Sequence, residues 1–139
     1  GQTLRSADGW TIIDFEGEPL KPLAQRRLPD SVWRDVAGML RSFDYVRAAH
    51  PDPTSAPAAA WSAAARHAFL DGYCQGASPD SGVLDAYELD KAVYEVVYET
   101  RNRPDWAHIP LGAVHNVARR TAPSPTHDSP SRTHNSKEN

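Results

Sequence analysis

The stretch TLRSADGWTIIDF, residues 3–15, decides how the fold begins. Its two ends, TLR and WTIIDF, carry the β-branched, aromatic and aliphatic side chains that are typical of strands, and SADG lies between them. Asp8 followed by Gly9 is a strong short-range signal for a tight turn between antiparallel strands. We therefore expect a β-hairpin over residues 3–15, with its turn centred near Asp8.

Three carboxylates and a proline follow along the second strand: Asp14, Glu16, Glu18 and Pro19. Negative charge at the end of a buried strand is costly unless a cation lies beside it. That cation is either a basic side chain or a metal ion. Residues 16–29 also contain three prolines, so we expect this segment to be irregular.

Helical patterns fill most of the remaining chain. Asp30 or Ser31 caps the first helix, and RPDW ends the longest one. The expected helices cover residues 30–48, 58–74, 83–103 and 111–120. The side chains expected in the core of the first two are Val32, Val36, Met39, Leu40, Phe43, Trp61, Ala65, Ala68 and Phe69. The sequence thus predicts an α+β, mostly helical domain over residues 1–120, and a disordered tail over residues 121–139.

Composition narrows the class of protein. The 139 residues suffice for one small domain, and a net charge of −3 gives no reason to expect a nucleic-acid partner. No run of eighteen apolar residues is present, so we expect no membrane association through a spanning helix. The single cysteine, Cys74, excludes an internal disulfide and favours the reducing cytoplasm. The six histidines show no zinc-ligand spacing.

The hairpin offers a possible cation site. With the turn centred near Asp8, Gln2 and Asp14 lie equally far from it and face each other on neighbouring strands, about 4.8 Å apart. Two oxygen-bearing side chains at that spacing suit a hard cation such as Mg²⁺. The same spacing also fits a structural arrangement in which Asp14 bonds local backbone and Gln2 is simply polar.

The helix over residues 83–103 has two faces at 100° per residue. One is expected to be the core stripe, made of Leu89, Ala92, Val93 and Val96. The other carries an amphipathic strip of three tyrosines and a lysine, with a glutamate beside them: Tyr87, Lys91, Tyr94, Tyr98 and Glu95. Aromatic rings suit the C–H faces of a sugar, and the polar groups suit its hydroxyls. Tyrosines packed under a loop with their hydroxyls outward would give the same pattern.

Three segments together resemble one known family. Gly1-Gln2 with the hairpin and DFEGEP, RRLPDSVWRDVAGMLRSFDY at residues 26–45, and ELDKAVYEVVYETRNRPDW at residues 88–106 resemble the C-terminal lobe of bacterial maltokinases. That family is part of the aminoglycoside-phosphotransferase-like branch of the protein-kinase fold. The resemblance covers most of the chain, and its motifs follow in order with sensible spacing.

The resemblance implies roles for the hairpin residues. In the family the catalytic loop reads H-G-D-x-H-x-G-Q, so Gln2 looks like the counterpart of the Asn that holds Mg²⁺ in kinases, and Asp14 like the DFG aspartate. Glu16 either reaches the same metal or bonds backbone or a basic side chain. The base aspartate would lie upstream of Gly1, as would the ATP-binding N-terminal lobe. No catalytic base is therefore expected in this chain, and the chain alone is expected to be inactive.

The resemblance also gives the acceptor helix and one anchor a role. It implies that Lys91, Tyr94, Glu95 and Tyr98 contact the non-reacting glucose of maltose, with smaller roles for Tyr87 and Arg101. Asp35 is expected to hold the catalytic loop through backbone amides, as a structural residue. Arg26 and Arg27 either balance the carboxylates of EGE or form a solvated basic pair.

The expected function is therefore that of a kinase segment. The resemblance implies ATP-dependent conversion of maltose to maltose 1-phosphate in α-glucan and trehalose metabolism, with Mg²⁺ and ATP, in the cytoplasm. It also implies an association with the missing N-terminal lobe and possible fusion to a trehalose synthase. Two alternatives stay open: a non-catalytic helical module that binds sugar or a partner, and a kinase for another small hydroxylated acceptor such as an aminoglycoside.

Overall fold

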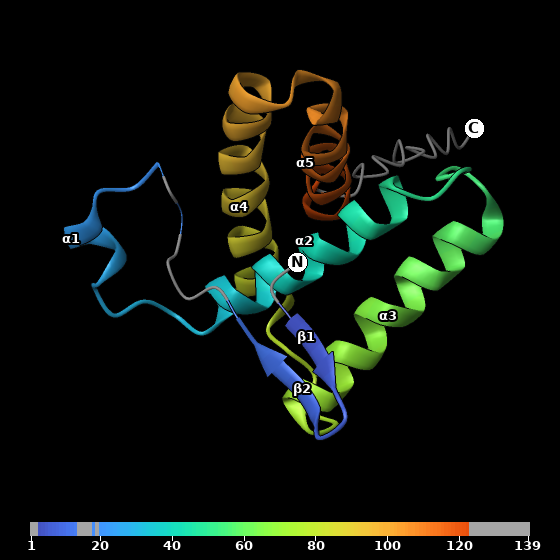
Figure 1. The fold of residues 1–139 in the computed structure, drawn as a ribbon, viewed down its shortest axis with the longest axis horizontal. Helices are drawn as coiled ribbons and strands as arrows, with labels where there is room; N and C mark the ends of the chain where they lie inside the picture. Colours follow the sequence, from blue (N-terminus) through green and yellow to red (C-terminus); the bar gives the residue numbers. More distant parts are fainter. Residues whose placement is uncertain (1–2, 14–17, 19, 123–139) are drawn as a thin grey trace, which may run out of the picture.

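The computed structural model describes residues 3–13, 18 and 20–122. In this part of the chain a two-stranded antiparallel sheet precedes a set of helices (Figure 1), which confirms an α+β, mostly helical fold. No helix of the described residues is long and apolar enough to cross a membrane. The elements are β1 (Thr3–Ser6), β2 (Gly9–Ile12), α1 (Leu23–Arg26), α2 (Trp33–Ala48), α3 (Ala56–Cys74), α4 (Ser81–Asn102), the 3₁₀ turn η1 (Pro104–Trp106) and α5 (His108–Thr121).

The hairpin forms where it was predicted, but its register differs by one residue. Ser6 pairs with Gly9 and Thr3 with Ile12, so the loop consists of two residues. Gly9 adopts a φ of +127°, which glycine tolerates far better than other residues. A turn centred on Asp8 would have placed Thr3 opposite Ile13, and this prediction is wrong. The Gln2–Asp14 pairing that depended on it lies outside the described residues.

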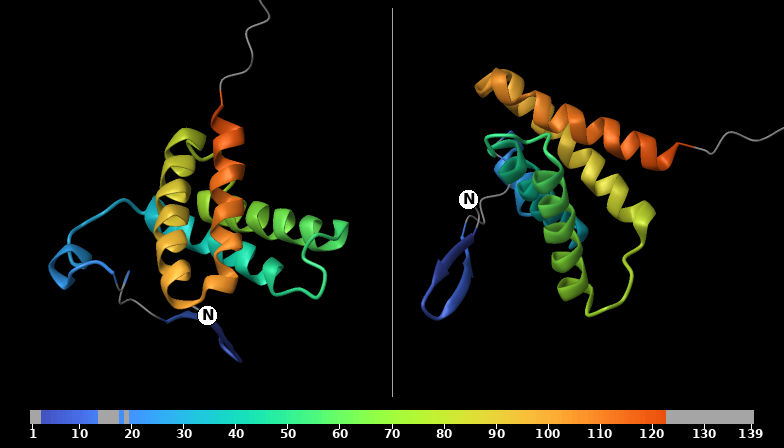
Figure 2. Two further views of the ribbon diagram at one scale, coloured as in Figure 1. Left: turned by 90° about the horizontal axis from the view of Figure 1, so that it is seen from above. Right: turned by 90° about the vertical axis from the view of Figure 1, so that its right-hand side faces the viewer.

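The hairpin projects away from the helices (Figure 2). Both strands are mostly exposed, and Trp10 and Ile12 are 71% and 63% exposed. The guanidinium of Arg5 lies 6.0 Å from the centre of the Trp10 ring. The expectation of a buried strand is therefore wrong for the described residues of β2.

Helix α2 supplies the centre of the core. Val36 and Leu40 are fully buried and meet Leu84 of α4. This matches the predicted stripe in part, because Met39 and Phe43 are half-buried. Val32 is exposed, since it precedes the first helical turn.

Helix α3 runs beside α2, and the predicted face is buried only in part: Phe69 packs against the core and Ala65 is half-buried. Ser55 caps it by accepting a hydrogen bond from the backbone of Ala58, and Gln75 ends it in the left-handed region at φ +53°. Ala58 and Ser62 are its buried residues, whereas Trp61 and Ala68 are exposed. A helix this rich in alanine is apolar on nearly every side, so periodicity cannot select the packed face.

Helices α4 and α5 lie side by side (Figures 1 and 2). The carboxylate of Asp80 accepts from the backbone of Gly82 and Val83 at 3.0 and 3.1 Å and caps α4. The helix ends before Pro104, as RPDW predicted. Helix α5 ends at Thr121, and residues 123–139 of the predicted tail lie outside the described residues.

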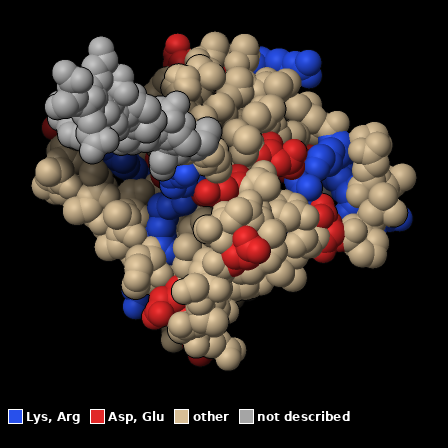
Figure 3. Space-filling model, turned by 180° about the vertical axis from the view of Figure 1, so that it is seen from behind, with Lys and Arg blue, Asp and Glu red and all other residues tan. Residues whose placement is uncertain are grey.

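The interface of α4 with its neighbours is charged. Arg41 of α2 donates to Glu95, Arg66 of α3 and Arg120 of α5 both contact Glu88, and these two glutamates are buried. On the back of the molecule, basic and acidic side chains are intermingled (Figure 3). The core stripe predicted for this helix is therefore largely wrong. Ala92 is its only buried member, and Val93 is 51% exposed.

The burial of Glu95 makes the stability of the folded protein depend on pH. Burial raises the pKa of Glu95 above its ordinary value of 4.5, although the guanidinium of Arg41 opposes this. The folded state then binds more protons than the unfolded state, so the stability that Glu95 contributes is greatest below pH 4.5 and is lost as the pH rises through the raised pKa. In urea unfolding between about pH 4 and pH 7, we expect wild-type protein to lose stability relative to Glu95→Gln. A pH-independent difference between them would contradict this.

Candidate functional site

A strip on the exposed side of α4 contains three of the predicted acceptor residues, Lys91, Tyr94 and Tyr98. The two tyrosine rings stack with their centres 6.4 Å apart and an angle of 16° between their planes. The Lys91 ammonium lies 5.1 Å from the centre of the Tyr94 ring. All three side chains are half-buried, so each has one side on the protein and one side open. The structure thus brings these three residues together, as their spacing predicts.

The aromatic strip continues past the end of α4. The Arg103 guanidinium lies 5.8 Å from the Tyr98 ring centre and 4.8 Å from that of Trp106. The Tyr45 ring stacks on the Trp106 ring, with their centres 6.0 Å apart. Arg103 and Trp106 lie at and beyond the C-terminal end of α4, where the helical period no longer applies, so the spacing argument missed them.

Tyr87 lies near the other end of this face but contacts α2 instead. Its hydroxyl donates to Asp30 at 3.4 Å, and its ring lies 5.3 Å from the Arg34 guanidinium. Arg34 also forms ion pairs with Asp30 and Asp90. These contacts attach the start of α2 to α4, so Tyr87 has a structural role here.

Glu95 does not join the strip. It is 8% exposed and accepts a hydrogen bond from Arg41 Nε at 2.8 Å, inside the interface of α2 and α4. The prediction placed it beside the tyrosines. At 100° per residue it is turned about 40° from Lys91 toward buried Ala92, and α2 covers that side of the helix.

Glu18 fastens the segment after the hairpin to this strip. It is 8% exposed, its Oε1 lies 3.1 Å from Lys91 Nζ, and its Oε2 lies 2.6 Å from Lys21 Nζ. The backbone N–H of Leu20 donates to the Tyr94 hydroxyl at 3.3 Å. Burial alone would raise the pKa of Glu18, but the two ammonium groups outweigh it and hold the pKa below its ordinary value. The sequence required either a basic side chain or a metal ion beside these carboxylates. For Glu18, the structure shows two lysines in that place.

The remaining predicted site residues stay untested. Gln2, Asp14 and Glu16 lie outside the described residues, and the described part of the chain holds no group of three His, Cys, Asp or Glu side chains placed to bind a metal. Asp35 is exposed in the first turn of α2, and Arg101 is exposed near the end of α4. The structural role of Asp35 therefore remains a prediction.

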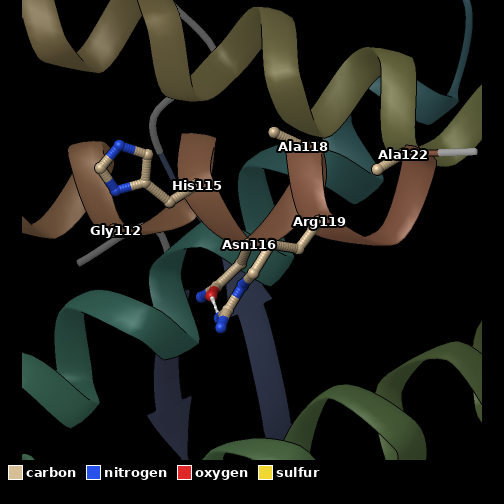
Figure 4. A pocket seen from close by; sticks show the side chains of 6 residues that line it. All are labelled: Gly112, His115, Asn116, Ala118, Arg119 and Ala122. Atoms are coloured by element: carbon tan, nitrogen blue, oxygen red, sulfur yellow. Dashed lines mark hydrogen bonds between the residues drawn. The ribbon is translucent and has the colours of Figure 1, made fainter. Parts of the chain in front are cut away.

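A surface hollow lies elsewhere. It has a volume of about 670 Å³, and its described lining comes from exposed residues of α5 and the residue after it (Figure 4). Arg119 donates to Asn116 there at 2.5 Å. None of the strip residues lines this hollow, so we do not assign it to the acceptor site.

Comparison with known proteins points to kinases. The chain is 33% identical over 121 residues to a glucosamine kinase of Streptacidiphilus jiangxiensis, an alignment that covers 79% of this chain and 28% of that protein. It is 31% identical over 124 residues to a glucosamine kinase of Mycolicibacterium smegmatis, covering 82% and 31%. Both relatives are kinases by name. The chain spans under a third of their length, and no family model matches it.

These relatives support the prediction of a kinase-type phosphotransferase at that coarse level. Their names contain glucosamine and not maltose, so they give no support to maltose as the acceptor.

Proposed function

We propose that this chain is the C-terminal part of an ATP-dependent sugar kinase, and that its acceptor lies against the strip of Lys91, Tyr94 and Tyr98. The kinase relatives support the reaction class, and the strip supports a sugar acceptor. Tyrosine rings offer flat apolar surface for the C–H faces of a pyranose. The Lys91 ammonium has three N–H donors, and those not directed at Glu18 are available to sugar hydroxyls.

The charge of this face favours a neutral sugar. The described carboxylates that interact with the strip or its extension are already paired: Glu18 with two lysines, Glu95 with Arg41 and Glu99 with Arg103. A ligand ammonium would therefore meet the Lys91 ammonium and no uncompensated carboxylate among the described residues of this face. This observation favours a neutral sugar, and the resemblance to maltokinases makes maltose, phosphorylated at its anomeric hydroxyl, our leading acceptor.

Glucosamine is the second candidate, and the names of the relatives favour it. Its ammonium would need a carboxylate from a part of the protein that the structure does not describe. A glucosamine kinase would also phosphorylate a sugar hydroxyl, so the two candidates share the reaction and differ only in the acceptor.

The residues that would hold the metal are Gln2, Asp14 and Glu16, which bear the oxygen ligands that Mg²⁺ prefers. When bound, Mg²⁺ neutralises phosphate charge on ATP. The base would come from upstream of Gly1, and the protein's own contribution is to place the acceptor hydroxyl in line with the phosphate. Cytoplasmic location and association with a trehalose synthase remain predictions from the resemblance alone.

A panel of acceptors tests this proposal. The full-length protein that contains this chain is incubated with ATP, Mg²⁺ and maltose, glucosamine, glucose or an aminoglycoside, and ADP release is measured. We expect maltose to give the highest kcat/KM. Glucosamine as the best acceptor would favour the second candidate, and sugar binding without phosphorylation would favour the non-catalytic module.

Replacing a ring of the strip should weaken acceptor binding selectively. For Tyr98→Ala we expect the KM for the sugar to rise by up to about tenfold and the KM for ATP to stay the same, since an aromatic contact contributes about 0.5–1.5 kcal/mol beyond its buried area. Trp61→Ala is the matched control, because that ring is also partly exposed but lies on α3. Equal effects of the two substitutions on the sugar KM would count against the strip.

A further inference from the structure

Glu18 connects two parts of the proposed site. It follows Asp14 by four residues in the sequence, and its side chain reaches Lys91 on α4, far along the chain. It is buried, and it is the described residue of the acidic run after β2. The adjoining Leu20 bonds the hydroxyl of Tyr94. Glu18 and Leu20, two residues apart, thus contact Lys91 and Tyr94, which lie one helical turn apart in the strip.

We propose that Glu18 is a positioning residue that holds Lys91 for the acceptor. This inference rests on the proposed function. Lysine has a flexible four-carbon side chain, and its ammonium keeps one position only when a partner holds it. Glu18 provides that partner at 3.1 Å, and its own burial reduces screening of the pair by solvent ions.

Lys21, the second lysine bound to Glu18, leaves Lys91 only partly neutralised. Lys21 also pairs with Glu18, so one carboxylate is shared by two ammonium groups. The three groups together carry one net positive charge. Lys91 is therefore oriented without being fully neutralised, and it lies over the Tyr94 ring, which the Leu20 contact holds in turn.

The test compares kinetic constants of full-length enzyme. For Glu18→Gln we expect the KM for the sugar to rise about tenfold, with the KM for ATP within about twofold of wild type. Glu18→Asp keeps the charge on a shorter side chain and should recover part of the loss. An unchanged sugar KM in Glu18→Gln, with an active wild type, would overturn the inference alone. An inactive wild type would instead refute the proposed function.

A double-mutant cycle separates positioning from mere stability. If Glu18 acts through Lys91, then Glu18→Gln combined with Lys91→Met should raise the sugar KM no more than Lys91→Met does. Additive effects of the two substitutions would overturn the inference. If Glu18→Gln does not fold, Glu18→Asp replaces it in the same cycle.

Glu88→Gln is the matched control. Glu88 is 3% exposed, lies on the same helix and pairs with two basic groups, Arg66 and Arg120, but it faces α3 and α5. We expect its replacement to lower the Tm and leave the sugar KM unchanged. A rise of the sugar KM equal to that of Glu18→Gln would show a general structural effect and would also overturn the inference.

Discussion

Replacing Arg41 by methionine is expected to lower the free energy of unfolding by about 3–5 kcal/mol, because it leaves a buried carboxylate without its partner. Arg41 is 1% exposed and donates through Nε to Glu95 at 2.8 Å. It also pairs with Asp44, and its guanidinium lies 5.6 Å from the Tyr45 ring centre. Urea unfolding of wild-type and variant protein measures the difference.

Two further variants make this prediction specific. In Arg41→Met/Glu95→Leu both charges are removed, so we expect most of the lost stability to return. In Arg34→Met the lost ion pairs are partly exposed, and we expect a change of about 1 kcal/mol or less. If Arg41→Met were no more destabilising than Arg34→Met, burial of the α2–α4 ion pair would not matter to stability.

Replacing Asp14 by asparagine is expected to lower kcat for sugar phosphorylation by about 10³-fold in the full-length enzyme, on the scale seen when one electrostatic contact to the transition state is removed. The reason is the predicted role of Asp14 as a ligand of Mg²⁺, where loss of one negative charge weakens the metal at the phosphates. Raising the Mg²⁺ concentration should restore part of the activity. Initial rates over a Mg²⁺ titration provide the measurement.

Asp8→Asn is the control for this substitution. Asp8 belongs to the same hairpin but lies exposed in its two-residue loop, and asparagine is as acceptable there as aspartate. We expect it to leave kcat unchanged. Near-wild-type turnover in Asp14→Asn would defeat the metal assignment, whatever the acceptor is.

Several features of this protein follow from its sequence because they depend on local interactions. The tight turn at Ala7-Asp8 forms where the sequence predicts a hairpin, because Gly9, which begins β2, accepts a positive φ. Helix α4 ends just before Pro104 because proline has no N–H to donate and its ring clashes with the preceding turn. Lys91, Tyr94 and Tyr98 come together because residues three, four and seven apart share one side of any α-helix.

Other features were decided only by the tertiary structure. The side of α4 that becomes buried is set by arginines on α2, α3 and α5, which pair with its glutamates across long stretches of chain. Helical periodicity places Glu95 near the tyrosines, but it cannot tell that Arg41 will lie on its other side. Likewise, the acidic run after the hairpin requires a cation, and only the folded chain identifies Lys91 and Lys21 as the cations of Glu18. The physical reason is that charge pairing depends on distance in space, and sequence spacing gives that distance only within a single helix or hairpin.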